Sequence, residues 1–191
     1  MKIKNVAAFV TALSLAPTLA HAHPGHGSSL QAGLAHPVQG LDHILAMVAV
    51  GLWAAQLGGR ARWAVPAAFV VVMMLGNALG MTGFAVPLIE PAIVCSVILL
   101  GLLVLTAVRL PIVASMAVVG GFALFHGLAH GAEVPANASG LAYMLGFALT
   151  TAAFHGCGLA AGAALVQFAK IPWLRFAGAA IAVAGTLLAI G

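Results

Sequence analysis

Charged residues are scarce in this chain of 191 residues. Asp, Glu, Lys and Arg together make up only 5% of it, whereas hydrophobic residues make up 63%. About a quarter of the residues are charged in an ordinary soluble domain, so this composition excludes a soluble fold and indicates an integral membrane protein. The seven Lys and Arg residues are scattered rather than clustered, which excludes a nucleic-acid-binding surface.

Cysteine is also scarce, and its placement excludes several kinds of site. The two cysteines, Cys95 and Cys157, lie in apolar runs and form no CxxC pair. Both fit small buried hydrophobic residues, although a role for Cys157 beside His155 stays open. The chain contains no GxxxxGK[ST] motif, so no process driven by a bound nucleotide is expected.

The first 22 residues have the features of a secretory signal peptide. Lys2 and Lys4 form a basic start, and residues 6–19 are apolar but too short to span a bilayer. Residues 20–22 read Ala-His-Ala, the small-x-small pattern of a cleavage site. We therefore expect cleavage after this tripeptide, which leaves residues 23–191 as one transmembrane domain. The alternative is an uncleaved N-terminal helix.

Six later segments are apolar enough to cross a bilayer, which takes about 20 residues of helix. They cover residues 37–57, 63–83, 88–108, 111–130, 139–168 and 172–190. The loops between them are short, so neighbouring helices are antiparallel. The predicted fold is an all-α membrane protein, a compact bundle of six transmembrane helices. The fifth segment is longer than one crossing needs, and Gly156 and Gly158 are candidates for a break or tilt in it.

The basic residues predict the orientation of this bundle. Those that follow the signal lie in or beside the first, third and fifth loops: Arg60, Arg62, Arg109, Lys170 and Arg175. Positive residues favour the cytoplasmic side, so both ends of the mature chain are predicted to be periplasmic, as a cleaved secretory signal requires. We expect the chain to lie in the inner (plasma) membrane of a bacterium.

Ionisable side chains concentrate at the predicted periplasmic end, first in residues 36–47. This stretch reads His-Pro-Val-Gln-Gly-Leu-Asp-His-Ile-Leu-Ala-Met. In a continuous helix, positions 36, 40, 43 and 47 form one stripe. Gly40 leaves the stripe open, and Asp42 lies next to it, either as a ligand or as an orienting partner for a histidine. Ionisable groups at membrane depth are costly and usually functional.

A second group of ionisable residues lies near the end of the fourth segment. His126 and His130 are one helical turn apart, Glu133 follows three residues later, and His155 lies near the middle of the fifth segment. Two histidines at this spacing can share a metal ion. Imidazole with some carboxylate suits nickel, cobalt, copper, zinc or iron, whereas calcium and magnesium require more oxygen ligands. A proton relay through the paired histidines, and a packing role for His155, stay open.

Four further residues have two interpretations each. Met47 is either a core residue or a ligand, and Glu90 either caps the third segment or binds metal. His23 and His26 lie at the expected mature N-terminus, where they either capture metal or belong to a tail without that role.

Small residues predict where the helices approach one another. GxxxG patterns occur at residues 76–80, 127–131 and 158–162, and glycine at this spacing allows close helix contacts. Asn77, within the first pattern, is expected to form an interhelical hydrogen bond.

The pattern His-Pro-x-x-Gly-x-Asp-His-x-x-x-Met at residues 36–47 resembles the signature of the HupE/UreJ family. The similarity extends over the signal, the six spans, the acidic residue that opens the third span, and Phe-His-Gly-x-x-His-Gly at residues 125–131. The resemblance implies a nickel permease, accessory to hydrogenase or urease, and some related transporters handle cobalt. It implies His36, Asp42 and His43 as the main metal ligands, supported by Met47, Glu90, His126, His130 and His155.

The sequence therefore predicts a transporter that moves Ni²⁺, or alternatively Co²⁺ or another divalent transition metal, from periplasm to cytoplasm for metalloenzyme supply. The ion is the substrate, and no prosthetic group is expected. The expected partners are the metal ion and the lipid bilayer, with a homo-oligomer left open. One rival function is a membrane metal sensor or accessory subunit that does not transport. An enzyme is disfavoured because no nucleophile–base pair stands out.

Overall fold

The computed structural model describes residues 29–84, 86–135, 138–168 and 171–191. The predicted signal peptide, His23, His26 and Lys170 lie outside the described residues. Within those residues the chain is helical and contains no strand. The elements are α2 (Ser29–Ala35), the 3-10 helix η2 (His36–Val38), α3 (Leu41–Leu57), α4 (Ala61–Met81), α5 (Ile89–Thr106), α6 (Ile112–Ala132), α7 (Gly140–Phe168) and α8 (Ile171–Ile190).

Five of these helices, α4 to α8, are long and apolar enough to cross a membrane. A sixth crossing exists if α2, η2 and α3 count as one span, which is bent by 81° between Val38 and Leu41. The prediction of an all-α membrane protein is confirmed. The number of spans is five or six, depending on how this bent segment is counted.

The first span was predicted as one helix from residue 37, and this prediction is wrong. Pro37 has no amide hydrogen to donate to the Gly33 carbonyl, so α2 ends at Ala35. The chain then makes one 3-10 turn, and α3 begins only after Gly40, whose backbone is extended with φ −106° and ψ 123°. The expected helical stripe through positions 36, 40, 43 and 47 is therefore interrupted, with His36 before the bend.

The fifth predicted span is a single uninterrupted helix. α7 runs through 29 residues, and Gly156 and Gly158 do not break it. Gly158 serves another purpose, because a side chain there would overlap the Val48 carbonyl of α3. This glycine allows α7 to lie directly against α3.

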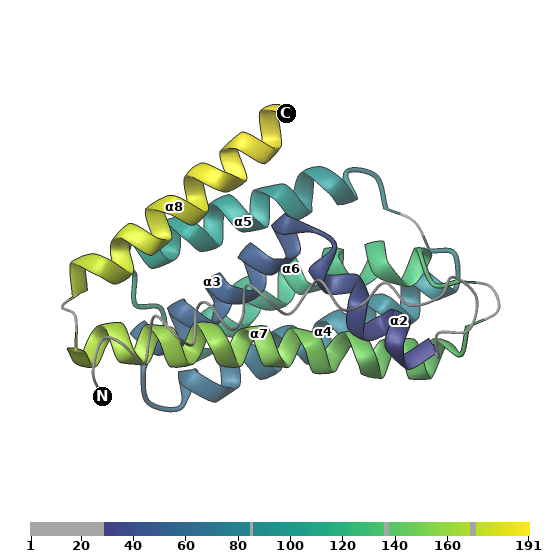
Figure 1. The fold of residues 1–191 in the computed structure, drawn as a ribbon, viewed down its shortest axis with the longest axis horizontal. Coiled ribbons are helices and arrows are strands. Elements are labelled where there is room, and N and C mark those ends of the chain that lie inside the picture. The colour runs from purple at the N-terminus through teal and green to yellow at the C-terminus, as the bar shows by residue number, and fades with distance from the viewer. Residues whose placement is uncertain (1–28, 85, 136–137, 169–170) are drawn as a thin grey trace.

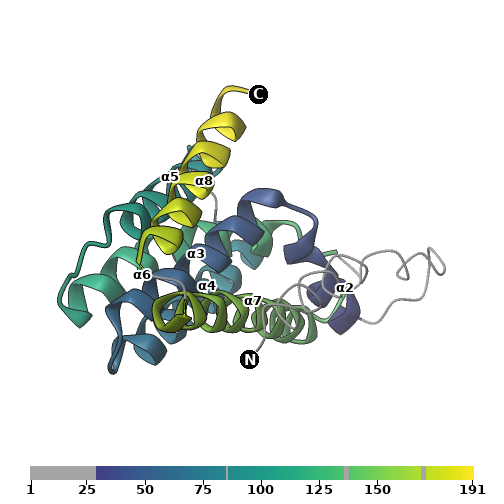
Figure 2. The same cartoon turned by 60° about the vertical axis from the view of Figure 1, so that its left-hand side comes forward.

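The helices pack in pairs that are not neighbours in sequence. α4 lies along α6, α3 along α7 and α5 along α8, and α2 also packs on α7. Figures 1 and 2 show α5 and α8 side by side, while α3 contacts both α5 and α7. α3 is accordingly the central helix, with nine buried residues that include Ala46, Val50 and Trp53.

Glycines form the closest contacts within these pairs. A side-chain carbon at Gly127 of α6 would overlap the Met73 carbonyl of α4, and one at Gly76 would lie 2.6 Å from the Leu124 carbonyl. The GxxxG predictions at 76–80, 127–131 and 158–162 are confirmed as contacts of this kind. The sequence analysis did not single out Gly33 with Gly146 between α2 and α7, or Gly101 with Gly178 between α5 and α8.

The end of the bundle that carries the basic residues is held by side-chain bonds to the last turn of α5 and to the short connection that follows it. Trp53 and Gln56 of α3 donate to the carbonyls of Val108 and Val104, at 3.0 and 2.9 Å. Arg175 of α8 donates to the Leu105 carbonyl at 2.7 Å. The end of α3, the α5–α6 connection and the start of α8 therefore meet at one end of the molecule. Which side of the membrane this end faces stays a prediction.

Candidate metal site

Four histidines from three segments converge near the opposite end of the bundle. His36 comes from η2, His43 from the first turn of α3, and His126 and His130 from the last two turns of α6. The ring centroid of His130 lies 4.4 Å from that of His43 and 4.7 Å from that of His36, and the His43 and His126 centroids are 5.0 Å apart. The structure thus brings the two sequence motifs together.

Two groups of three side chains in this cluster have the dimensions of a metal site. The inner triad is His43, His126 and His130, and the outer triad is His36, His130 and Glu133. In each triad the candidate ligand atoms, one from each residue, all lie within 4.8 Å of one another. Ligand nitrogens around a tetrahedral ion are about 3.4 Å apart, so small side-chain movements would close either triad on an ion.

Each buried imidazole has one nitrogen that is already fixed by a hydrogen bond. Nδ1 of His43 lies 2.6 Å from Oδ1 of Asp42, which also accepts the His43 backbone N–H at 2.8 Å. Nδ1 of His155 donates to the Met47 carbonyl at 2.8 Å. The opposite nitrogen, Nε2, of His43, His130 and His155 is buried and has no hydrogen-bond partner among the described residues. Metal-binding histidines have this arrangement, with one nitrogen oriented by a partner and the other free.

Gly40 preserves the space that the Asp42–His43 pair needs. A side-chain carbon at Gly40 would lie 2.5 Å from Oδ1 of Asp42 and 2.6 Å from Nδ1 of His43. Because its φ is negative, any residue could adopt its backbone conformation. The requirement for glycine is therefore steric.

His126 is oriented by α5, a helix that the sequence analysis did not connect to its ring. The hydroxyl of Ser96 donates to the Ile93 carbonyl at 2.6 Å, so its oxygen accepts the Nε2–H of His126 at 2.9 Å. Nδ1 of His126 is then left without a proton, as a metal ligand requires. Ser96 is fully buried, but a serine in an apolar run gave no signal that could have identified it.

Glu133 joins the two histidines of the outer triad. Its Oε2 accepts a hydrogen bond from Nε2 of His36 at 2.9 Å and lies 3.3 Å from Nδ1 of His130. The hydrogen bond with His130 lowers the pKa of Glu133 to about 2, so the carboxylate remains charged. The sequence analysis noted this residue three positions after His130 without counting it as a ligand, and that spacing was the available signal.

Aromatic rings surround the histidines. The Phe147 ring lies 4.4 Å from His130, and the Phe69 ring lies 5.7 Å from His126 and 5.0 Å from His155. The Tyr143 ring is 5.8 Å from His36, and its hydroxyl is buried without a partner among the described residues. These rings exclude water from the free nitrogens. The sequence analysis missed them because an aromatic residue in an apolar helix is ordinarily a core residue.

A family model described as HupE / UreJ protein matches residues 11–188. The chain belongs to this family. It is 47% identical over 194 residues to Protein HupE of Rhizobium leguminosarum bv. viciae, in an alignment that covers 100% of both chains. No solved structure matches the chain. The resemblance indicated by residues 36–47 is therefore confirmed.

Four of the candidate ligands among the described residues lie outside both triads of this HupE/UreJ family member. Asp42 is one of them, and its carboxylate contacts His43 instead. The other three are Met47, His155 and Glu90. Met47 is buried, and the contact described above uses its carbonyl rather than its sulfur. His155 lies near the middle of α7 and contacts the Phe69 ring, which also contacts His126. Glu90 is exposed in the first turn of α5, where it lines a cavity of about 400 Å³ together with residues of α8.

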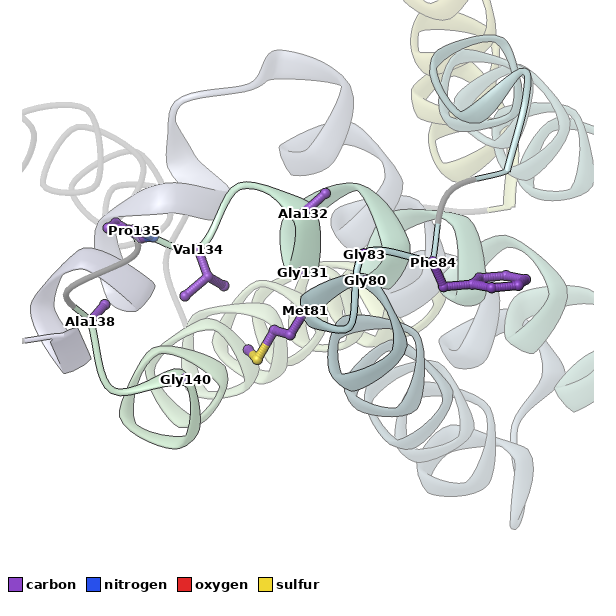
Figure 3. A pocket seen from close by; sticks show the side chains of 10 residues that line it. All are labelled: Gly80, Met81, Gly83, Phe84, Gly131, Ala132, Val134, Pro135, Ala138 and Gly140. Atoms are coloured by element: carbon purple, nitrogen blue, oxygen red, sulfur yellow. The ribbon is translucent and has the colours of Figure 1, made fainter.

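The residues of the triads are not among those that line the cavity nearby. That cavity, of about 430 Å³, lies between the α4–α5 and α6–α7 connections, and Figure 3 shows Met81 and Val134 between these segments. Its lining residues include Gly131 and Ala132 of α6, but none has an ionisable side chain. The ring of Phe84 points away from the other lining residues. The cavity therefore offers no imidazole or carboxylate ligand of its own.

Proposed function

We propose that this protein transports a divalent transition metal ion across the inner membrane, from periplasm to cytoplasm, for metalloenzyme supply such as that of hydrogenase or urease. Ni²⁺ is the favoured ion, and Co²⁺ is the alternative. The observation that carries the proposal is the set of buried imidazoles, each with one nitrogen held by a hydrogen bond and the other free, inside a multi-pass membrane protein.

The imidazole and carboxylate ligands of the two triads favour a transition metal of intermediate softness. The inner triad offers three imidazole nitrogens, and the outer triad offers two imidazoles and one carboxylate. Such ligands suit nickel and cobalt, whereas calcium and magnesium need more oxygen atoms. The cluster is also well suited to transit, because a permeating ion must bind at several sites, none of which retains it.

The arrangement gives the ion an order of positions. Glu133 is 55% exposed, so the outer triad is where an ion would first meet the protein. The inner triad would then replace the water around the ion, and His155, beyond the Phe69 ring, would be the next nitrogen on the route. A membrane potential of 100 mV, inside negative, favours entry of a dication by about 4.6 kcal/mol, so the potential supplies a driving force without nucleotide.

Uptake into sealed liposomes tests the proposal directly. Purified protein should accumulate radiolabelled nickel in the lumen, saturably and faster with an inside-negative potential, and cobalt should compete. Protein-free liposomes and a His126→Gln variant are the controls. Nickel that binds to the protein but never enters the lumen would instead support a sensor or accessory subunit.

Reporter fusions at Gly191 test the proposed orientation. A C-terminus on the periplasmic side makes the fusion active only with a reporter that works in the periplasm. Activity with a cytoplasmic reporter would reverse the orientation or remove one crossing, most simply the bent α2–η2–α3 segment.

A further inference from the structure

His130 belongs to both triads, and its two ring nitrogens have different surroundings. Nδ1 lies 3.3 Å from Oε2 of Glu133, in the outer triad. Nε2 is buried without a hydrogen-bond partner among the described residues, and it is the nitrogen left for the inner triad with His43 and His126. A neutral imidazole carries one proton and one free lone pair. The ring can therefore bind an ion through only one nitrogen at a time.

The two triads also differ in exposure. The side chains of His36 and Glu133 in the outer triad are 24% and 55% exposed. In the inner triad, the side chain of His43 is 13% exposed and that of His130 is 4% exposed. An ion from solution reaches the outer triad first, and the carboxylate there can replace part of its hydration shell before the ion meets nitrogen ligands alone.

We infer that the triads are two successive positions of a single ion and that His130 is the ligand common to both. The inference rests on the proposed function, because it describes how the ion moves within that site. In the outer position the ion is held by His36, Glu133 and Nδ1 of His130, whose proton is on Nε2. In the inner position the ion is held by His43, His126 and Nε2 of His130, whose proton is on Nδ1.

The transfer leaves the number of protons on the ring unchanged. As the ion leaves Nδ1, that nitrogen takes a proton from the solvent that reaches the exposed Glu133 beside it. As the ion arrives at Nε2, that nitrogen gives its proton to a water molecule leaving the hydration shell of the ion. Glu133 changes from ligand to acceptor, because its Oε2 lies 3.3 Å from the newly protonated Nδ1. This hydrogen bond orients His130 for the inner position. The shared ring makes the two positions mutually exclusive, so the pair holds one ion per chain.

Metal stoichiometry of the full chain tests this inference. The protein is purified in detergent with His23→Ala and His26→Ala, which removes the two histidines of the expected mature N-terminus. Equilibrium dialysis with micromolar Ni²⁺ should give one bound ion per chain. Co²⁺ is then used as a spectroscopic probe, because its visible absorption reports the ligands around it.

Three single substitutions distinguish the outer ion position from the inner one. Glu133→Gln should retain one Co²⁺ with the spectrum of a nitrogen-only site, and His126→Gln should retain one with a different, oxygen-containing spectrum. His130→Gln disables both positions, so its nickel affinity should fall by more than about 100-fold, beyond the range for a merely orienting residue. The double variant Glu133→Gln/His126→Gln should be as weak. Thr186→Val, whose hydroxyl only bonds its own helix at Ala182, is the control for folding in detergent.

Several outcomes would overturn the inference. Two ions per chain in the protein with intact triads would make the sites independent, and this measurement needs no variant of the triads to fold. Near-normal affinity in His130→Gln, or identical Co²⁺ spectra for the Glu133 and His126 variants, would also remove the shared ligand. Failure of the proposed function looks different: the one-ion pattern would be present, but nickel would not accumulate in liposomes.

Discussion

The histidine cluster differs from the rest of the bundle in the imidazole nitrogens that it leaves without hydrogen-bond partners among the described residues. Away from the histidines, Thr106 bonds to the Leu102 carbonyl of its own helix at 2.6 Å and Thr186 to the Ala182 carbonyl at 2.9 Å, while Trp53, Gln56 and Arg175 bond to carbonyls of a neighbouring segment. In the histidine cluster, polar groups bond across helices and leave free nitrogens behind. A hydroxyl that donates to a carbonyl of its own helix needs no partner on a neighbouring helix. A buried free nitrogen costs free energy, which is why we interpret the second region as the functional one.

The two regions do not differ in how their helices are packed. Gly101 and Gly178 bring α5 against α8 in the same way that Gly127 brings α6 against α4. Glycine contacts therefore provide the scaffold, and the side chains next to them provide the chemistry. In α6, Gly127 and Gly131 each follow a histidine by one residue, a rotation of about 100° around the helix. The contact with α4 thus fixes the direction in which His126 and His130 project.

Breaking this scaffold should have the largest effect. Gly127→Ala places a carbon against the Met73 carbonyl, and a backbone atom cannot move aside as a side chain can. We expect a loss of about 3 kcal/mol in the free energy of unfolding, at the upper end for overpacking, and loss of nickel binding with it. Unfolding in detergent, followed by circular dichroism, measures the change.

Gly121→Ala is the matched control in the same helix. A carbon at Gly121 meets nothing within 4 Å, so the free energy of unfolding should change by less than about 1 kcal/mol, in the stabilising direction. Equal destabilisation by both substitutions would show that glycine flexibility, rather than the α4–α6 contact, matters in α6.

Much of the scaffold could be predicted from sequence, because apolar length and GxxxG spacing are local signals. The bend at residues 39–40 was missed, although Pro37 and Gly40 are local signals for it, because the spacing of residues 36, 40, 43 and 47 was interpreted as one helical stripe. The histidine motifs identified the site chemistry, but their convergence depends on α3 and α6 meeting in space. Ser96 and Phe69 reach the cluster only through tertiary packing. Asn77 illustrates the opposite error: its side-chain oxygen is buried without a partner among the described residues, rather than bonded between helices as expected.

Removing the charge of Asp42 should have the next largest effect. Asp42→Asn keeps the size of the side chain, but its neutral amide orients His43 less strongly than the carboxylate that now lies 2.6 Å from Nδ1. Loss of a carboxylate that orients a metal-binding histidine costs about 10- to 100-fold in metal affinity. Nickel dialysis measures this loss, and the unfolding transition should stay where it is. Unchanged affinity and uptake would remove Asp42 from the site.

External acid should weaken uptake to a smaller degree. Metal-binding histidines must be deprotonated, and an unperturbed histidine has a pKa of about 6.5, so one competing proton lowers the apparent nickel affinity about tenfold between about pH 7.5 and about pH 5.5. Glu133 does not contribute, because its pKa of about 2 keeps it charged throughout this range. Raising the nickel concentration should restore uptake. Faster uptake in acid at every nickel concentration would instead indicate proton-coupled import.

The smallest expected effect compares two serines that represent the two regions. Ser96 accepts a hydrogen bond from His126 across helices, whereas Ser115 bonds to the Pro111 carbonyl of its own chain segment, and both are fully buried. Ser96→Ala leaves Nε2 of His126 without its acceptor, so the ring is free to present either nitrogen to the inner triad. A hydrogen bond of about 1 kcal/mol corresponds to about a fivefold loss of nickel affinity.

Ser115→Ala should leave nickel affinity unchanged, because no residue of either triad depends on it. If both variants lost affinity equally, the effect would come from general loosening of the bundle. If only Ser96→Ala lost it, with an unchanged unfolding transition, the loss would come from the cross-helix bond that orients His126 for the inner triad.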